Sequence, residues 1–239
     1  MGGFRLAEPA LKARPLPASS CGAQGGGRRL AALPLALFAA GCATYGSHLT
    51  ATPIAPGESE LTLAADGLLI DRGFGLQPLP NPDASLRWGL ADGVDLGLRA
   101  HFVGLESTAR VRLVRSGAFS LAAVPGLGFA FVPVTNEDTG LFNANLLGGL
   151  LAGLGLGGGD ELVLGARAIA TYAFPLTAFR GDASGDKMLY RVGGVVGVRV
   201  RLSDSLSLFP DLNVFAPYDS ERKDWTLPIL QGGVALSFD

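Results

Sequence analysis

The stretch Leu189–Leu202, LYRVGGVVGVRVRL, decides the fold because its side chains alternate in character with a period of two. One face of this stretch is apolar, and the other carries arginine and glycine. The apolar face holds Tyr190, Val192, Val196, Val198, Val200 and Leu202, and the second face holds Arg191, Gly193, Gly197, Arg199 and Arg201. Alternation over this length predicts a long β-strand with a different environment on each side.

The same alternation recurs along the chain, most clearly at Val94–Phe102 and Glu161–Phe174. Extending the reading outward from these stretches predicts strands near residues 59–70, 84–91, 94–103, 107–115, 118–132, 141–156, 161–174, 188–202, 205–216 and 226–238. Ten is an even number, as a closed up-and-down barrel of antiparallel strands requires.

Tight turns and longer links alternate between these strands. Turn residues occur at 92–93, 116–117, 157–160 and 203–205, which fall on every second connection. The longer links are 71–83, 133–140, 175–187 and 217–225, whereas the link 103–106 is short. This pattern predicts a barrel with one rim of turns and one rim of loops.

Alternation alone leaves open whether the apolar face lines a core or meets lipid, because a soluble barrel alternates as well. Small residues and arginines on the other face suit a crowded interior with paired charges. Lysine is scarce for a soluble surface, with only Lys12, Lys187 and Lys223. We therefore expect the apolar face to meet lipid. A soluble barrel around an apolar ligand is the alternative.

The chain closes on GGVALSF, residues 232–238, with Val234, Leu236 and Phe238 on one face. This ending resembles the C-terminal strand of bacterial outer-membrane barrels, although Asp239 follows the aromatic residue. The resemblance to small outer-membrane β-barrel proteins covers residues 58–238. It implies an all-β fold, a single antiparallel up-and-down transmembrane β-barrel of about ten strands.

The N-terminal region has the order of a secretory signal peptide. Arg28 and Arg29 precede an apolar run that ends in LALFAAGCATYG, residues 35–46. The run is shorter than the ~20 residues that a membrane helix needs. Ala39–Cys42 resembles the lipobox of bacterial lipoproteins, with alanine at the position where leucine is usual. That resemblance implies cleavage before Cys42 and a lipid on Cys42.

These features divide the chain into three expected parts. Residues 1–41 are expected to be leader and signal peptide, within which 1–27 indicates a start codon assigned too far upstream. Residues 42–57 are expected to be a tether, and residues 58–239 the barrel. Without residues 1–41, which hold five of the 19 basic and one of the 21 acidic residues, the formal charge is −6. This charge does not favour nucleic acid as a partner.

The polar faces of the strands predict a cluster of charged side chains in the lumen. Its expected members are Arg87, Asp95, Arg99, His101, Arg110, Arg112, Glu161, Arg167, Arg191, Arg199, Arg201 and Asp211. The turns predict that Glu161 lies near Arg199 and Arg201 and that Arg99 lies nearly opposite Arg110. A barrel of about ten strands is close to the size that side chains can fill, so we expect a salt-bridged interior. The alternative is a small anion-selective passage or a site for an anionic ligand.

Motifs for other chemistry are weak in this sequence. Residues 153–158 contain GxGxxG, but a strand pattern follows, so a hairpin turn is predicted in place of a nucleotide site. Residues 141–156 are predicted to be a strand, since they are too short and too rich in glycine for a membrane helix. His101 has no carboxylate near it in sequence, and His48 is expected to be solvated in the tether. We expect no catalytic residues, no metal site and no cofactor.

Taken together, these features predict an exported outer-membrane barrel with a lipid on Cys42, a structural or interaction role and a largely filled lumen. Its acidic external loops could contact lipopolysaccharide or an external partner. The alternatives are a periplasmic lipoprotein with a soluble ligand-binding barrel, a small anion channel and an outer-membrane enzyme. The sequence does not indicate an oligomeric state.

Overall fold

The computed structural model describes residues 48–71, 76–102, 104–134, 139–177, 187–219, 223–225 and 228–239, and Cys42 lies outside these ranges. The strands are β1 Ser59–Asp71, β2 Leu76–Ala91, β3 Val94–His101, β4 Gly104–Ser116, β5 Phe119–Ala123, β6 Gly126–Val134, β7 Thr139–Gly157, β8 Asp160–Thr177, β9 Lys187–Ser203, β10 Leu206–Asp219, β11 Asp224–Trp225 and β12 Ile229–Phe238. Within the described part of the chain, no helix has the length and apolar character needed to cross a membrane.

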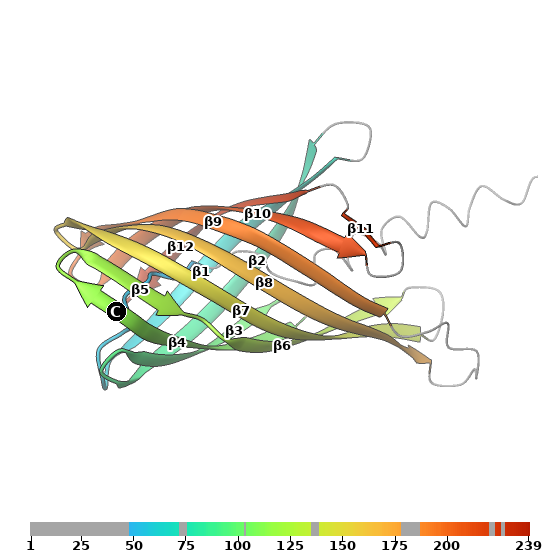
Figure 1. Ribbon diagram of the computed structural model, residues 1–239, viewed down its shortest axis with the longest axis horizontal. Helices are drawn as coiled ribbons and strands as arrows, with labels where there is room; N and C mark the ends of the chain where they lie inside the picture. Colours follow the sequence, from blue (N-terminus) through green and yellow to red (C-terminus); the bar gives the residue numbers. More distant parts are fainter. Residues whose placement is uncertain are drawn as a thin grey trace, which may run out of the picture.

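The strands form one closed antiparallel barrel (Figure 1). Each wall strand pairs with its neighbours in sequence, and the first strand pairs with the last, with Leu61 opposite Phe238. β5 and β6 together form one wall strand between β4 and β7, and β11 is a two-residue addition to β10. The wall therefore has ten strands, and the predicted all-β up-and-down barrel is confirmed.

The break between β5 and β6 lies at Val124 and Pro125. Proline has no N–H to donate to a ladder, so it is found at interruptions of a sheet. The wall stays closed because Ala109 N donates to Pro125 O at 2.9 Å and Val124 N donates to Gly149 O at 2.8 Å. This interruption explains why one predicted strand, 118–132, is observed as two.

The tight turns predicted at 92–93, 116–117, 157–160 and 203–205 lie at one end of the barrel, where the C-terminus also lies (Figure 1). The hairpin between β7 and β8 needs glycine, because Gly158 and Gly159 have φ values of +66° and +97°. The GxGxxG segment thus ends in a hairpin turn, as predicted, and residues 141–156 lie in β7 as a strand.

The connection between β3 and β4 corrects one expected register. β4 begins at Gly104, which pairs with His101, so residues predicted to be a link already belong to the strand. Arg110 consequently lies opposite Asp95, and Arg99 lies opposite Glu106. The expectation that Arg99 faces Arg110 is wrong, because the tighter turn moves β4 along β3.

The apolar face of the wall points outward. Val196 and Leu98 are each 41% exposed on the outer surface, whereas the side chains of Asp95 and Arg110 are enclosed, with exposed fractions of 0% and 1% for the residues. A soluble barrel around an apolar ligand requires the opposite placement, so the structure contradicts that alternative. The barrel instead has the polarity of a protein surrounded by hydrocarbon.

The enclosed space is divided into two sectors. Strands β1 to β4 contribute the charged sector, whose buried residues are Glu60, Asp66, Asp83, Arg87, Asp95, Arg99, Glu106 and Arg110. Strands β7 to β10 contribute the large apolar residues, called the apolar sector below, although these strands also bury four charged side chains. The apolar residues include Leu147, Leu151, Val163, Ile169, Val195, Phe209 and Phe215, and the charged ones are Glu161, Arg167, Arg191 and Asp211. The apolar sector was not predicted from the sequence.

Because the outward face is apolar, an arginine placed on it should lower the stability of the barrel in lipid. Val196 lies at the middle of β9, and Leu202 lies near the end of the same strand. We expect Val196→Arg to lower the free energy of unfolding by about 2–4 kcal/mol in lipid vesicles, and Leu202→Arg by about 0–1 kcal/mol. Urea titration monitored by tryptophan fluorescence measures both. Equal, negligible effects would contradict contact between this face and lipid.

Candidate functional site: a plugged lumen

An N-terminal segment, residues 48–57, runs through the lumen and is called the plug below. His48 and Ala51 have exposed fractions of only 6% and 0%, and Leu49 and Thr50 are also buried. The plug reaches the rim of tight turns at Gly57, whose N–H donates to Gly89 O at 3.0 Å, and the chain then enters β1. These residues were expected to form a solvated tether, and for His48 that expectation is wrong.

Buried carboxylates of the wall accept the main-chain N–H groups of the plug. Ala51 N donates to Glu161 Oε1 at 2.9 Å, and Ile54 N donates to Asp95 Oδ2 at 2.9 Å. His48 N donates to Asp211 Oδ2 at 3.3 Å. The three carboxylates come from β8, β3 and β10. They replace the partners that a neighbouring strand would supply, since a buried N–H needs an acceptor.

Side chains of the plug divide between the two sectors of the lumen. Leu49 and Ala51 join the apolar cluster that includes Val195 and Phe209. Thr50 faces the charged sector, where Arg110 Nη1 donates to Thr50 O at 2.8 Å and to Thr50 Oγ1 at 2.6 Å. The plug thus alternates with a period of two, like a strand, and complements both sides of the lumen.

Asp95 is the centre of the first ionic group. Arg87 Nε donates to Asp95 Oδ1 at 3.1 Å, and Arg110 Nε donates to Asp95 Oδ2 at 2.8 Å. A second nitrogen of each guanidinium contacts the same oxygen. Arg87 also donates to Thr108 Oγ1 at 2.9 Å. Two buried cations therefore share one carboxylate, which also accepts the N–H of Ile54.

His48 is the centre of the second ionic group. Its Nε2 lies 2.7 Å from Asp66 Oδ1, and its Nδ1 lies 3.5 Å from Asp211 Oδ2. The backbone φ of His48 is +39°, a left-handed conformation that bends the chain here. The imidazole thereby reaches β1 while the main-chain N–H reaches β10. His48 connects the end of the plug to two wall strands.

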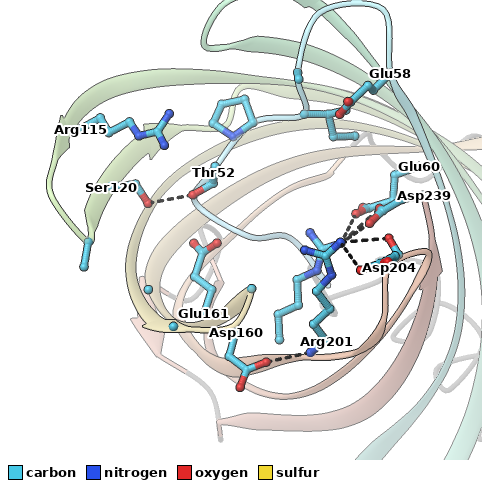
Figure 2. Close-up of a pocket in the computed structure, with 18 of the residues that line it drawn as sticks. Thr52, Glu58, Glu60, Arg115, Ser120, Asp160, Glu161, Arg201, Asp204 and Asp239 are labelled. Carbon is cyan, nitrogen blue, oxygen red and sulfur yellow. Dashed lines mark hydrogen bonds and ion pairs between the residues drawn. The ribbon is translucent and has the colours of Figure 1, made fainter.

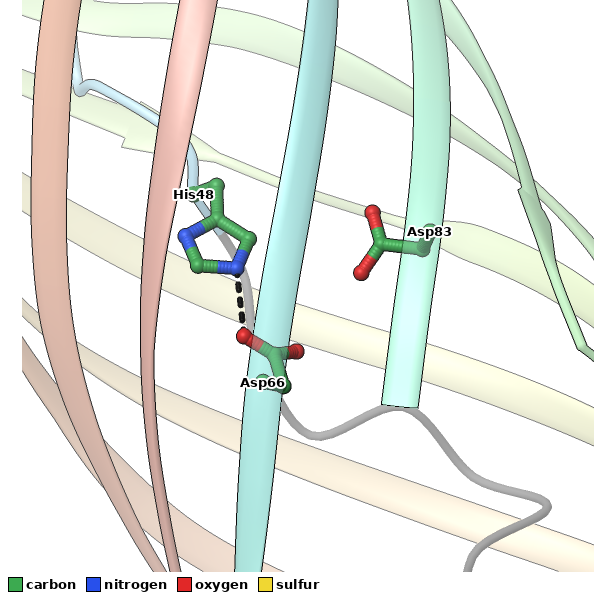
Figure 3. A group of neighbouring side chains, drawn as sticks. All are labelled: His48, Asp66 and Asp83. Carbon is green, nitrogen blue, oxygen red and sulfur yellow. Dashed lines mark hydrogen bonds and ion pairs between the residues drawn. The ribbon is translucent and has the colours of Figure 1, made fainter. Parts of the chain in front are cut away.

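His48, Asp66 and Asp83 bring three possible metal ligands together (Figure 3). Their oxygens are already engaged, however. Asp66 Oδ2 accepts from Gln231 Nε2 at 2.6 Å and lies 3.4 Å from Arg99 Nη2, and Asp83 pairs closely with Arg99. Because the guanidinium already supplies the positive charge here, the group is better described as an ion-pair network than as a metal centre.

The structure distributes the predicted cluster between the lumen and its rim. Buried members are Arg87, Asp95, Arg99, Arg110, Glu161, Arg167, Arg191 and Asp211. His101, Arg112 and Arg199 are partly exposed, and Arg201 is exposed. The predicted residues thus form several groups at different depths.

The rim members bond locally. Arg199 lies opposite Glu161 in the register, but its guanidinium lies 3.1 Å from Glu60 Oε2 and 3.2 Å from Asp239 Oδ1. Arg112 pairs with Asp92 of the adjacent turn at 2.6 Å. The exposed pair between Arg112 and Asp92 contributes little to stability.

His101 lies at the end of β3, and its buried Nδ1 atom has no hydrogen-bond partner. A general base needs a group that orients its ring. Within the described residues, no group forms a hydrogen bond with Nδ1 that could orient the ring of His101.

Several lumen residues were missed by the sequence analysis. Asp83 and Glu106 fell within predicted links, and Asn213 and Gln231 gave no charge signal. With Asp83 and Glu106 included, the described residues hold seven buried carboxylates against five buried arginines. The lumen is therefore not predominantly cationic.

A cavity of about 1010 Å³ opens at the rim of tight turns (Figure 2). Charged residues around it include Glu58, Glu60, Arg115, Asp160, Glu161 and Arg201. Thr52 of the plug also lines the cavity, and its Oγ1 lies 3.3 Å from Ser120 Oγ. The plug thus forms part of the cavity wall.

Neither a family model nor a curated protein sequence matches this chain. Among solved structures, the chain is similar to the outer membrane protease OmpT from Escherichia coli, with 7% identity, a TM-score of 0.43 and coverage of 78% of this chain and 98% of that chain. It is also similar to the translocator domain of the autotransporter NalP from Neisseria meningitidis, with 12% identity, a TM-score of 0.41 and coverage of 89% and 95%. Neisserial surface protein A, NspA, has 11% identity, a TM-score of 0.36 and coverage of 75% and 96%. At these scores, function has to be inferred from this chain's own residues.

The carboxylate of Asp95, which two buried arginines share, leads to a testable prediction for stability. Asp95→Asn removes the charge that compensates two buried guanidiniums, so we expect the free energy of unfolding to fall by about 3–5 kcal/mol. Asp92→Asn is the matched control, because it breaks the exposed pair with Arg112 and should cost at most about 1 kcal/mol. Denaturant unfolding of the refolded barrels measures both. Equal losses would contradict a special role for Asp95.

Proposed function

We propose that this protein is an outer-membrane barrel whose own plug seals the lumen, with a structural or interaction role carried by its external loops. The single observation behind the proposal is the seating of residues 48–54 on buried carboxylates of three different strands. The apolar outer face supports insertion in a membrane, and the rim of tight turns with the C-terminus supports the usual orientation with short turns in the periplasm.

Sealing follows from the way in which the lumen is filled. The plug occupies the space between a charged and an apolar sector, and buried side chains of Arg110, Phe209 and Phe215 project from the wall. A barrel of this strand number has little interior space beyond its side chains. General diffusion of metabolites would therefore require the plug to leave.

Anion passage receives no support from the charges. Two of the buried arginines, Arg87 and Arg110, are bound to Asp95, and Arg99 is bound to Asp83. Buried carboxylates outnumber buried arginines within the described ranges. An incoming anion would meet a lumen in which three of the five described buried arginines are already paired with carboxylates.

A lipid on Cys42 remains part of the proposal. It is supported by the order of basic, apolar and small residues before Cys42 and by the similarity of Ala39–Cys42 to a lipobox. The barrel itself should remain in the membrane without the lipid, because its apolar belt is far larger than one acyl anchor.

Conductance in planar lipid bilayers tests the seal. We expect the full barrel to show no stable open level, because the plug is held by buried hydrogen bonds. Replacing residues 48–54 with a glycine-serine segment of equal length removes the side chains of His48, Leu49 and Thr50, and should produce open levels. An equal replacement of residues 178–184, in the connection between β8 and β9, is the control. Identical open levels for all three proteins would refute sealing by the plug.

Heat-modifiability with a Cys42→Ala variant tests membrane insertion and lipid attachment separately. We expect both proteins to stay in the outer-membrane fraction and to migrate faster on a gel when unboiled, since a folded barrel resists detergent. Only the unchanged protein should incorporate a labelled fatty acid. Release of the variant as a soluble protein would contradict an independently inserted barrel.

A further inference from the structure

The wall of the barrel is lower at β3 and β4 than on either side of them at the loop end. The last pair between β2 and β3 is Asp83 with His101, and the last pair between β4 and β6 is Gly104 with Ala130. Both β2 and β6 continue toward the loop end beyond these pairs. The wall therefore has a notch above the β3–β4 turn.

Residues 76–82 of β2 and residues 131–134 of β6 border the notch. At the turn, two strand positions separate β2 from β6, or ~14 Å between the strand axes. The β1–β2 hairpin projects at the loop end and stands apart from the ends of β6 and β7 (Figure 1). Each bordering segment thus has one strand edge without a partner among the described residues.

Prolines remove hydrogen-bond donors from the free edge of β2. Alternate residues of an antiparallel strand direct their N–H and C=O groups to opposite neighbours. Gly89 N donates to Glu58 O at 3.0 Å, on the β1 side, and the register between β1 and β2 is unbroken from there to the loop end. Odd-numbered residues of β2 therefore face β1. Pro78, Pro80 and Pro82 occupy even positions that face the notch, where a proline has no N–H to donate.

The free edge of β6 also carries a proline. Pro125 O accepts from Ala109 N of β4 at 2.9 Å, so odd-numbered residues of β6 face β4. The register between β6 and β7 is unbroken from Gly126 to Val134, so Pro133 faces the notch. An edge that lacks donors is protected from pairing with another strand. Neither border therefore offers a regular ladder to a strand of a partner or of a second copy.

Exposed phenylalanines surround the floor of the notch on the outer face. Phe102, in the β3–β4 turn, is 76% exposed, and Phe129 and Phe131 of β6 are also exposed. Phe131 lies beyond the last pair between β4 and β6, so the apolar belt continues above the floor. Hydrocarbon of the membrane thus reaches a level at which β3 and β4 no longer separate it from the lumen.

We propose that an acyl chain of an outer-leaflet lipid occupies this notch and contacts the lumen-facing side chain of His101. The inference rests on the proposed function, because it requires an outer-membrane barrel whose tight turns lie in the periplasm. It goes further, because it names membrane lipid as a partner of the lumen edge and gives the place of contact.

The residues behind the notch allow this contact without opening a passage. On the β2 side, Asp83 pairs with Arg99, and a ring nitrogen of His48 lies within 4.8 Å of a carboxylate oxygen of Asp83. Charged groups and the end of the plug therefore close the lumen on that side. On the β6 side, the buried residue at this level is Ala130, which is small and apolar. The acyl chain binds along the β6 side, and the plug prevents it from passing further.

Quenching by brominated lipid tests the inference on the full chain, with Cys21 and Cys42 replaced by alanine. A His101→Cys variant is labelled with bimane while unfolded and is then folded into phosphatidylcholine vesicles, part of whose acyl chains are brominated. Ala100→Cys, exposed on the outer face of β3, is the lipid-facing control. Ser85→Cys, on the inward face of β2 where β1 and β3 flank it, is the enclosed control. Faster migration of each unboiled variant on a gel confirms folding.

We expect brominated lipid to quench the label at His101→Cys by a fraction close to that at Ala100→Cys, and to leave the label at Ser85→Cys unquenched. Quenching at His101→Cys no greater than at Ser85→Cys would overturn the inference. Quenching by aqueous iodide alone would overturn it as well, because water would then fill the notch. Disulfide-linked dimers of unlabelled His101→Cys would place a second copy there instead. If the folded Ala100→Cys variant is itself unquenched, the membrane barrel of the proposed function fails.

Discussion

A peptide N–H that is buried in a barrel without a neighbouring strand needs a hydrogen-bond acceptor. This constraint accounts for the position of several buried carboxylates in the lumen. Glu161, Asp95 and Asp211 meet it for the plug. The same constraint explains why carboxylates outnumber arginines among the described buried residues, since carboxylates here bind main-chain donors as well as guanidiniums. The polar part of the interior thus holds one extended segment through hydrogen bonds to its main chain.

The apolar sector and the charged sector act on opposite sides of this segment. Leu49 and Ala51 pack with residues such as Phe209, while Thr50 receives two hydrogen bonds from Arg110. Apolar burial is not directional, whereas hydrogen bonds between fixed groups are. We infer that the apolar contacts supply attraction for the plug and that Arg110, Asp95 and His48 determine its register along the lumen.

Period-two alternation in stretches such as Leu189–Leu202 was sufficient to predict the strands, the ten-stranded wall and the outward apolar face. Alternation did not reveal that Val163, Val195 and Phe209 form a buried apolar part of the inward face, where charged and small residues were expected. A tighter turn than expected moved Arg110 opposite Asp95. The plug itself was beyond prediction, since His48–Gly57 resembles a linker until the wall carboxylates that bind it are known. Local sequence carries no information on partners as distant as Asp211.

The junction between β1 and β12, the first and last strands, bears on how the barrel assembles. β1 and β12 complete the barrel, with Thr62 Oγ1 3.1 Å from Ser237 Oγ across their junction, and His48 contacts Asp66 on β1 and Asp211 on β10, the two strands that flank β12. The plug therefore bridges the two strands between which the last strand of the chain lies. Threading it through a finished cylinder would require it to pass a densely filled interior. We infer that insertion of the N-terminal segment is coupled to closure of the sheet, because the segment contacts strands on both sides of β12.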